Sequence, residues 1–229
     1  MKYLRAGLFL LSTVAIYLGL TLVGWGLGGL KGYFSLLPRM GYAVVVLLFA
    51  LCIGWQAIDS PEGVQGGKGE KGKLVRRETI LGGSLTAIAF ASLLVLPYLD
   101  RHNLAGFTDH PLLRWLGLAL SALGYALIFL SGLALGRQYS ADVTIQKDHH
   151  LITSGIYRRL RHPRYTGIFF LAVGLSLLFT TWIGLIVTVL LLAGLLFRMR
   201  DEETMLHKEF GPEWEQYCRV SLRLLPLIY

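Results

Sequence analysis

The feature that most constrains this chain is a succession of six hydrophobic blocks separated by short polar segments. A helix needs about 20 mainly apolar residues to cross the hydrocarbon core of a bilayer. The first four blocks meet or nearly meet this length, whereas the last two are near 16 residues, or about 24 Å of helix. The blocks are residues 4–27, 41–58, 80–99, 112–135, 165–179 and 182–197. We therefore expect an all-α integral membrane protein with about six transmembrane helices.

The composition and the charge distribution agree with this fold. The chain is 54% hydrophobic and only 16% charged, whereas about a quarter of the residues of a soluble domain are charged. Of its 22 Lys and Arg residues, 18 fall in the segments on the side of the N-terminus and 4 on the other side. This bias predicts cytoplasmic termini in an inner or plasma membrane, and it explains the net charge of +8 without a nucleic-acid partner.

The polar segments between the blocks are too short to fold alone, so residues 1–229 are predicted to form a single membrane domain. Only Thr180 and Thr181 separate the last two blocks, which predicts a tight helical hairpin. After Arg200 the chain becomes amphipathic, and Gly211 followed by Pro212 predicts the end of one helix and the start of another. This C-terminal amphipathic helix is expected to lie along the membrane surface or to cap the core.

A polar, basic and aromatic cluster interrupts the hydrophobic pattern before the fifth block. It begins at His150 and continues through the letters RHPRYTG, which start at Arg161. Because Pro163 suits the first turn of a helix and displaces the preceding residue from the helical region, His162 is expected at the mouth of that helix. The helix start carries positive partial charge, so this position favours an anionic group.

A second polar cluster follows the sixth block and contains Arg198, Glu202 and Glu203. If the last two blocks form a hairpin, these carboxylates return to the side of His162. Adjacent residues of a helix point about 100° apart, so we expect only one of the two glutamates to face a site. Arg198 lies one turn before Glu202, at a spacing that allows the two side chains to pair.

Together the clusters offer an anion site, aromatic ring faces and a carboxylate beside a hydrophobic interior. This combination suits a charged, soluble cofactor that meets a lipophilic substrate. The sequence has no phosphate-binding glycine loop, no zinc-ligand spacing and no nucleophile elbow, so a metal is not expected. Ionisable residues at a membrane boundary are candidates for function.

The pattern HHLITSGIYRRLRHPRYTG, followed by the hairpin and by EExxLxxxFG, resembles the isoprenylcysteine carboxyl methyltransferase family and related membrane methyltransferases. The resemblance covers residues from about 132 to the C-terminus, so residues 132–229 are expected to form a methyltransferase-like catalytic core. The spans within 1–111 carry no motif, and their role is unassigned.

The resemblance implies S-adenosylmethionine (SAM) as the cofactor, entering from the cytosol, and a lipophilic substrate that enters from the bilayer among the membrane lipids. Catalytic roles are implied for Arg198, Glu202 and Glu203. Cofactor binding is implied for His150, Leu151, Ile152, Gly155, Tyr157, Arg161, His162, Pro163, Tyr165 and Glu202.

Two other functions stay open at this point. Membrane reductases that use NADPH share a similar RHPxYxG motif, and a non-catalytic scaffold would need neither cofactor. Arg164 and the paired glutamates favour the methyltransferase over the reductase. The acceptor, whether an isoprenylcysteine carboxylate or another lipid-like thiol or amine, is open, as are the oligomeric state and the choice between the two glutamates.

Overall fold

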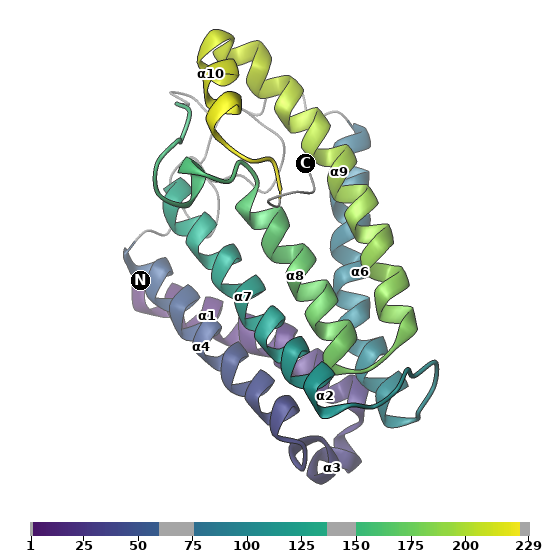
Figure 1. Cartoon of the computed structure of the whole chain (residues 1–229). Helices are drawn as coiled ribbons and strands as arrows, with labels where there is room; N and C mark the ends of the chain where they lie inside the picture. Colours follow the sequence, from purple (N-terminus) through teal and green to yellow (C-terminus); the bar gives the residue numbers. More distant parts are fainter. Residues whose placement is uncertain (1, 60–75, 137–149, 225–229) are drawn as a thin grey trace.

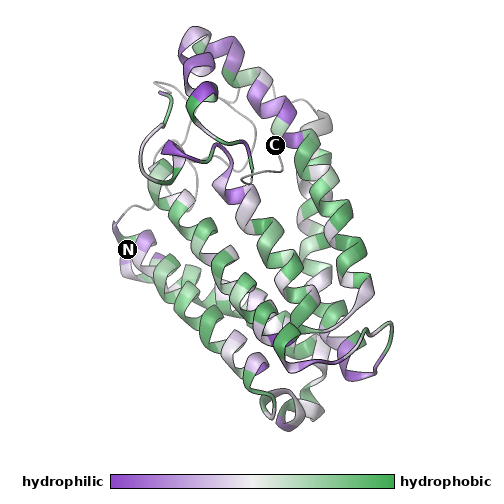
Figure 2. Ribbon diagram, viewed as in Figure 1, coloured by the Kyte–Doolittle hydropathy of each residue, from purple (hydrophilic) through white to green (hydrophobic). Residues whose placement is uncertain are grey.

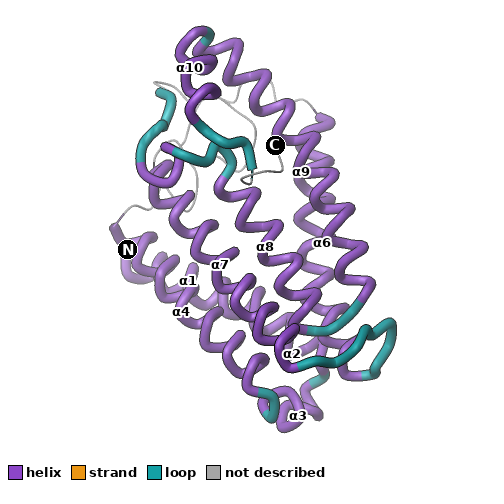
Figure 3. The backbone as a smooth tube through the Cα atoms, viewed as in Figure 1, coloured by secondary structure: helices purple, strands orange, loops and turns teal. Residues whose placement is uncertain are grey.

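The computed structural model describes residues 2–59, 76–136 and 150–224, and these residues form helices joined by loops (Figures 1 and 3). The Gly- and Lys-rich segment around residues 61–73 lies outside the described residues. The elements in chain order are α1 (Lys2–Thr13), η1 (Val14–Gly19, a π-helical stretch), α2 (Leu20–Trp25), η2 (Leu27–Gly29), α3 (Leu30–Phe34), α4 (Leu37–Asp59), α6 (Arg76–Arg101), α7 (Pro111–Leu135), η4 (Gly155–Arg158), α8 (Pro163–Leu178), α9 (Trp182–Phe210) and α10 (Pro212–Val220).

Five helical segments in the described part of the chain are long and apolar enough to cross a membrane. They are Lys2–Trp25, Leu37–Asp59, Ile80–Arg101, Pro111–Leu135 and Trp182–Phe210, and the apolar helix α8 is shorter. Apolar residues dominate the middle of the bundle, whereas polar residues gather toward α10 (Figure 2). The prediction of an all-α membrane fold is therefore confirmed, with α8 as the short member of the predicted hairpin.

The expectation that the helix of the sixth block is as short as the helix of the fifth block is wrong. Helix α9 continues beyond Phe197 for more than three further turns and ends at Phe210. The polar stretch after Phe197 is rich in Arg, Met and Glu, which are strong helix formers. Gly211, with a φ of 49°, ends the helix, and Pro212 starts α10 as predicted. An apolar block marks only the part of a helix that meets hydrocarbon.

Helices α7 and α8 approach closely along a seam of small residues. A Cβ atom added to Gly124 would lie 2.6 Å from the Gly167 carbonyl oxygen, and one added to Gly117 would lie 2.6 Å from the Gly174 carbonyl oxygen. Such distances leave no room for a side chain. Small residues let membrane helices associate through direct backbone contact, so this seam fixes the position of α8, which carries the first polar cluster.

The end of the bundle opposite α10 holds a buried charge cluster. Asp100 accepts two hydrogen bonds from the Arg114 guanidinium, at 2.8 and 2.9 Å, and lies 3.4 Å from Arg39 Nε. Arg114 also donates to the Leu178 carbonyl and to Asp109 (2.7 Å each). This far-end cluster ties α4, α6 and α7 to the end of α8. Sequence reasoning missed it, because these residues read only as loop charges.

Candidate active site

One cavity of about 410 Å³ runs between α6, α8 and α9 toward α10. Helix α9 lines it with one face, whose residues recur every three or four positions. These are Gly184, Thr188, Leu191, Leu195, Arg198 and Glu202. At 1.5 Å per residue this stripe extends over about 27 Å. The cavity is therefore long, with a polar end at Glu202 and apolar walls along the remainder.

The N-terminal half of the chain contributes part of the wall. Along α6 the lining runs from Gly82 to Leu96, and Tyr17 of η1 adds a ring to it. Gly82 faces Arg198, because a Cβ atom at position 82 would lie 2.3 Å from one of its terminal nitrogens. The missing side chain on α6 thus leaves space for the Arg198 guanidinium beside the cavity.

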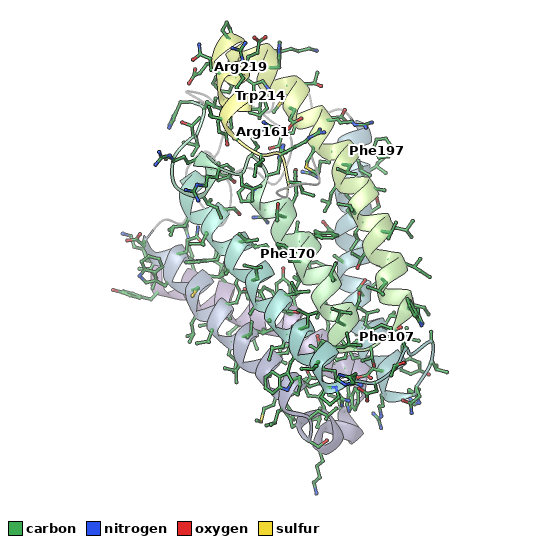
Figure 4. All side chains as sticks on the ribbon, in the orientation of Figure 1. Phe107, Arg161, Phe170, Phe197, Trp214 and Arg219 are labelled. Atoms are coloured by element: carbon green, nitrogen blue, oxygen red, sulfur yellow. The ribbon has the colours of Figure 1, made fainter. Side chains whose placement is uncertain are left out.

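The segment before α8 forms the rim of the polar end, and the rim is closed by α10 (Figure 4, where Arg161 and Trp214 are labelled at this end). His150, Leu151 and Ile152 line the cavity, as does Tyr157 in η4. The Tyr157 carbonyl accepts a hydrogen bond from the Tyr217 hydroxyl of α10 at 2.6 Å. Burial raises the pKa of Tyr217 to about 12, so its hydroxyl keeps the proton that it donates.

His162 lies at the entrance of α8, with Pro163 at the first helical position, as the sequence predicted. Its Nε2 lies 3.1 Å from Glu203 Oε1, and its Nδ1 lies 3.8 Å from Glu202 Oε2. The ring also stacks on Tyr165, at a centroid distance of 5.5 Å. The predicted hairpin therefore does bring the two polar clusters together.

Tyr165 joins the two helices of the hairpin. Its hydroxyl donates to Glu202 Oε2 at 2.8 Å and accepts from Arg198 Nε at 3.1 Å. The predicted association of Arg198 with Glu202 thus includes a contact through the Tyr165 hydroxyl. Because Tyr165 both donates and accepts, the three side chains form one continuous hydrogen-bonded chain at the polar end of the cavity.

Most of the predicted site residues share the cavity. Those that line it are His150, Leu151, Ile152, Tyr157, Arg161, His162, Tyr165, Arg198 and Glu202. Gly155, Pro163 and Glu203 do not appear in its lining. Gly155 has a φ of 59°, which suits glycine, and it opens the η4 turn. Of the two glutamates, Glu202 faces the cavity, whereas Glu203 contacts His162 from outside it.

The site also contains residues to which sequence reasoning gave no site role. Trp214 and Tyr217 of α10 line the cavity. They belong to the C-terminal amphipathic helix, which was expected to lie along the membrane surface or to cap the core, and no motif assigned these two residues to a site. Residues 221–224, here called the C-terminal strap, bring Arg223 to 2.9 Å from Glu203 Oε2. Arg161 fixes this strap by donating to the Ser221 carbonyl at 2.9 Å.

No group of three or more His, Cys, Asp or Glu side chains in the described parts of the chain could hold a metal ion. The polar end instead offers cations, one cavity-facing carboxylate and four aromatic rings. Such an arrangement suits an organic ligand with both charged and flat parts, and the apolar remainder of the cavity suits a hydrophobic chain.

The sequence is similar to those of several known membrane enzymes. The chain is 31% identical over 117 residues to a probable protein-S-isoprenylcysteine O-methyltransferase of Oryza sativa subsp. indica, covering 50% of this chain and 61% of that protein. It is 36% identical over 120 residues to the protein-S-isoprenylcysteine O-methyltransferase of Schizosaccharomyces pombe (47% and 49%). A match to a Delta(14)-sterol reductase of Mus musculus, 36% identical over 86 residues, covers 34% of this chain and 20% of that protein.

Among solved structures, that of the eukaryotic intramembrane Ras methyltransferase ICMT aligns over 98% of this chain and 74% of its own, with 22% identity and a TM-score of 0.48. The chain spans less than two thirds of the length of the curated methyltransferases named above. A sequence model described as the isoprenylcysteine carboxyl methyltransferase (ICMT) family matches residues 115–208. Residues 115–208 contain both polar clusters, so the part of the chain that carries the candidate site is similar to the isoprenylcysteine carboxyl methyltransferase family.

Proposed function

We propose that this protein is an integral membrane methyltransferase that transfers a methyl group from SAM to a lipophilic acceptor. The observation that carries the proposal is the continuity of the cavity. Its polar end, at His162 and Glu202, opens directly into an apolar extension that follows α9 back to Gly184. One cavity can therefore receive a charged cofactor and a lipid-like chain from opposite directions.

The residues at the polar end fit SAM. Its amino group suits the Glu202 carboxylate, and its carboxylate suits the cationic rim. Its adenosyl part suits the space beside His150 and Ile152. SAM supplies a methyl group that is already activated on a sulfonium cation. Ring faces attract such a cation, and Tyr157 and Trp214 provide them at the cavity wall.

The chain's own residues have the tasks of binding, orienting and excluding water. Trp214 and Tyr217 cover the polar end, and the apolar walls keep water from the remainder of the cavity. Arg198 and Glu202, held together by the Tyr165 hydroxyl, lie where the polar and apolar parts meet. We infer that they position the acceptor group for in-line transfer, which is the main contribution a protein makes to such a reaction.

The acceptor that best fits the cationic polar end is a carboxylate on a hydrophobic chain, as in an isoprenylcysteine. Arg198, where the polar and apolar parts meet, attracts the carboxylate, and the apolar stripe of α9 receives the chain. We place this end of the bundle and both termini on the cytoplasmic side of an inner or plasma membrane, because most Lys and Arg residues lie there. In this proposal residues 132–229 form the catalytic core, and α6 completes its substrate wall.

The test is methyl transfer in detergent, with radiolabelled SAM and an S-prenylated cysteine that has a free carboxyl group. The control acceptor is the same compound already converted to its methyl ester. We expect base-labile label on the free acid and none on the ester. Label on neither compound, or equal label on both, would contradict a carboxylate acceptor and leave an amine or a thiol to be tested.

A further inference from the structure

The C-terminal strap is attached to the segment that leads into α8 by backbone hydrogen bonds. The Leu222 amide donates to the Arg159 carbonyl at 2.8 Å, and the Leu222 carbonyl accepts from the Arg161 amide at 2.8 Å. The His162 amide donates to the Arg223 carbonyl at 3.2 Å. The strap is thus held in register with His162, and the position of the Arg223 side chain is defined.

The Arg223 side chain is buried, with 8% of its surface exposed, and its terminal nitrogen lies 2.9 Å from Glu203 Oε2. The other oxygen of Glu203 lies 3.1 Å from His162 Nε2. An ionised carboxylate can only accept hydrogen bonds, so His162 must carry a proton on Nε2 to bind it. Two polar contacts therefore link Arg223, which lies outside the cavity, through Glu203 to His162 at the cavity wall.

The opposite edge of the His162 ring faces the cavity side. Its Nδ1 lies 3.8 Å from Glu202, and the ring face stacks on Tyr165. The hydrogen bond made by one ring nitrogen determines the protonation of the other. Through its hydrogen bond to Nε2, Glu203 therefore influences whether the Nδ1 atom of His162 offers a hydrogen-bond donor or an acceptor to a ligand. The other charged group at this carboxylate is Arg161, whose Nε lies 3.5 Å from Glu203 Oε1.

We propose that Arg223 is a positioning residue of the active site, which acts by fixing Glu203 and, through it, the orientation and the protonated nitrogen of His162. The contribution of Arg223 to catalysis rests on the function proposed above, whereas its effect on the His162 ring does not depend on that function. The strap thereby makes the correct docking of the C-terminal segment a condition for a competent site.

The first test observes the His162 ring in the absence of any ligand. Protein labelled with ¹⁵N-histidine is measured by NMR in micelles, and His162→Ala identifies the signals. In the parent protein we expect Nε2 to stay protonated. In Arg223→Gln we expect the ring signals to move toward an average of the two neutral tautomers, and in Arg223→Lys to return most of the way, since the cation is restored.

The control is Arg219→Gln, which removes the same charge from an exposed position on α10. Parent-like ring signals in Arg223→Gln would overturn the proposal, and so would an equal change in Arg219→Gln. Near-ultraviolet circular dichroism establishes that each variant is folded. If Arg223→Gln does not fold, Arg223→Lys and Glu203→Gln carry the test, and an unchanged His162 ring in Glu203→Gln would overturn it.

The second test measures the affinity for SAM by calorimetry. We expect about tenfold weaker binding for Arg223→Gln, within about threefold of the parent for Arg223→Lys, and no change for Arg219→Gln. Unchanged affinity in Arg223→Gln together with an altered His162 ring would confine Arg223 to a structural role and overturn the proposal. If the parent itself does not bind SAM, the proposed function fails, whereas the NMR test of Arg223 stands.

Discussion

The two ends of the bundle bury charges in different ways. At the far end, Asp100 lies between Arg39 and Arg114, and all three side chains are at most 7% exposed. At the α10 end, the side chains of Glu202 and Glu203 are 31% and 20% exposed. The first group is enclosed by protein on all sides, whereas Glu202 of the second group borders an open cavity.

We interpret this difference as one between a structural cluster and the proposed functional one. A buried ion pair that is enclosed by protein holds helices in place and is not accessible to a ligand. A carboxylate, an imidazole and a guanidinium around a cavity keep part of their hydrogen-bonding capacity directed toward it. We therefore expect mutations at the far end to lower stability and mutations at the α10 end to lower binding and turnover.

The largest effect is expected for Asp100→Asn. It leaves the buried Arg39 guanidinium without its carboxylate and Arg114 with Asp109 alone, so the free energy of unfolding should fall by about 3–5 kcal/mol. Denaturant unfolding in mixed micelles measures this change. Asp109→Asn is the matched control, because Asp109 binds the same Arg114 with a side chain that is 63% exposed. If Asp100→Asn lost SAM binding at unchanged stability, the comparison would fail.

Glu202→Gln should lower turnover by about 100-fold or more, because a neutral amide cannot replace the charge that faces the reacting groups. The free energy of unfolding should change by less than about 1 kcal/mol. Initial rates of methyl transfer and unfolding curves check the two parts. The control is Glu209→Gln, an exposed position on the same helix. A stability loss as large as that of Asp100→Asn would mean that Glu202 is structural.

Tyr165→Phe removes the hydroxyl that joins Arg198 to Glu202 and preserves the ring. The loss of one donor and one acceptor should weaken SAM binding by about fivefold, which corresponds to the free energy of one hydrogen bond. Calorimetry measures the affinity, with Tyr98→Phe, half-exposed on α6, as the control. Parent-like affinity would show that the hydrogen-bonded chain through Tyr165 is not part of the cofactor site.

The smallest effect concerns pH. The hydrogen bond and the charge of Arg114 lower the pKa of Asp109 below its usual value. The carboxylate therefore stabilises the fold above the unfolded-state pKa of about 3.9, and this contribution is lost as the pH falls through the folded-state value. Since the side chain is largely exposed, we expect at most about 1 kcal/mol. Unfolding at pH 6 and pH 3 should show a smaller acid loss for Asp109→Asn than for the parent.

The membrane fold was predictable because apolar blocks report the spans directly, and the block boundaries near Thr180 and Thr181 predicted the turn between α8 and α9. The full length of α9 was not predictable from the apolar pattern, because its last turns are polar although their composition favours a helix. The far-end cluster was missed for a different reason. Its members are far apart in the chain, and only the packing of the helices brings them to one point.

The site was predictable where a local pattern carried chemistry. His162 before Pro163, and the glutamates after the hairpin, lie as close together as the sequence implied. The roles of Trp214 and Arg223 depend on how the chain turns back after α10, which no local pattern defines. Which glutamate faces the cavity depends on the orientation of α9 about its own axis, which the sequence does not define. This orientation directs Glu202 to the cavity and Glu203 to Arg223.

The most direct test of the central claim is calorimetric titration of the detergent-purified protein with SAM and, separately, with NADPH. The account predicts saturable binding of SAM at one site and no binding of NADPH. Binding of NADPH alone would contradict the methyltransferase and favour a reductase. Binding of neither, with and without an S-prenylated cysteine present, would contradict both and leave a membrane scaffold.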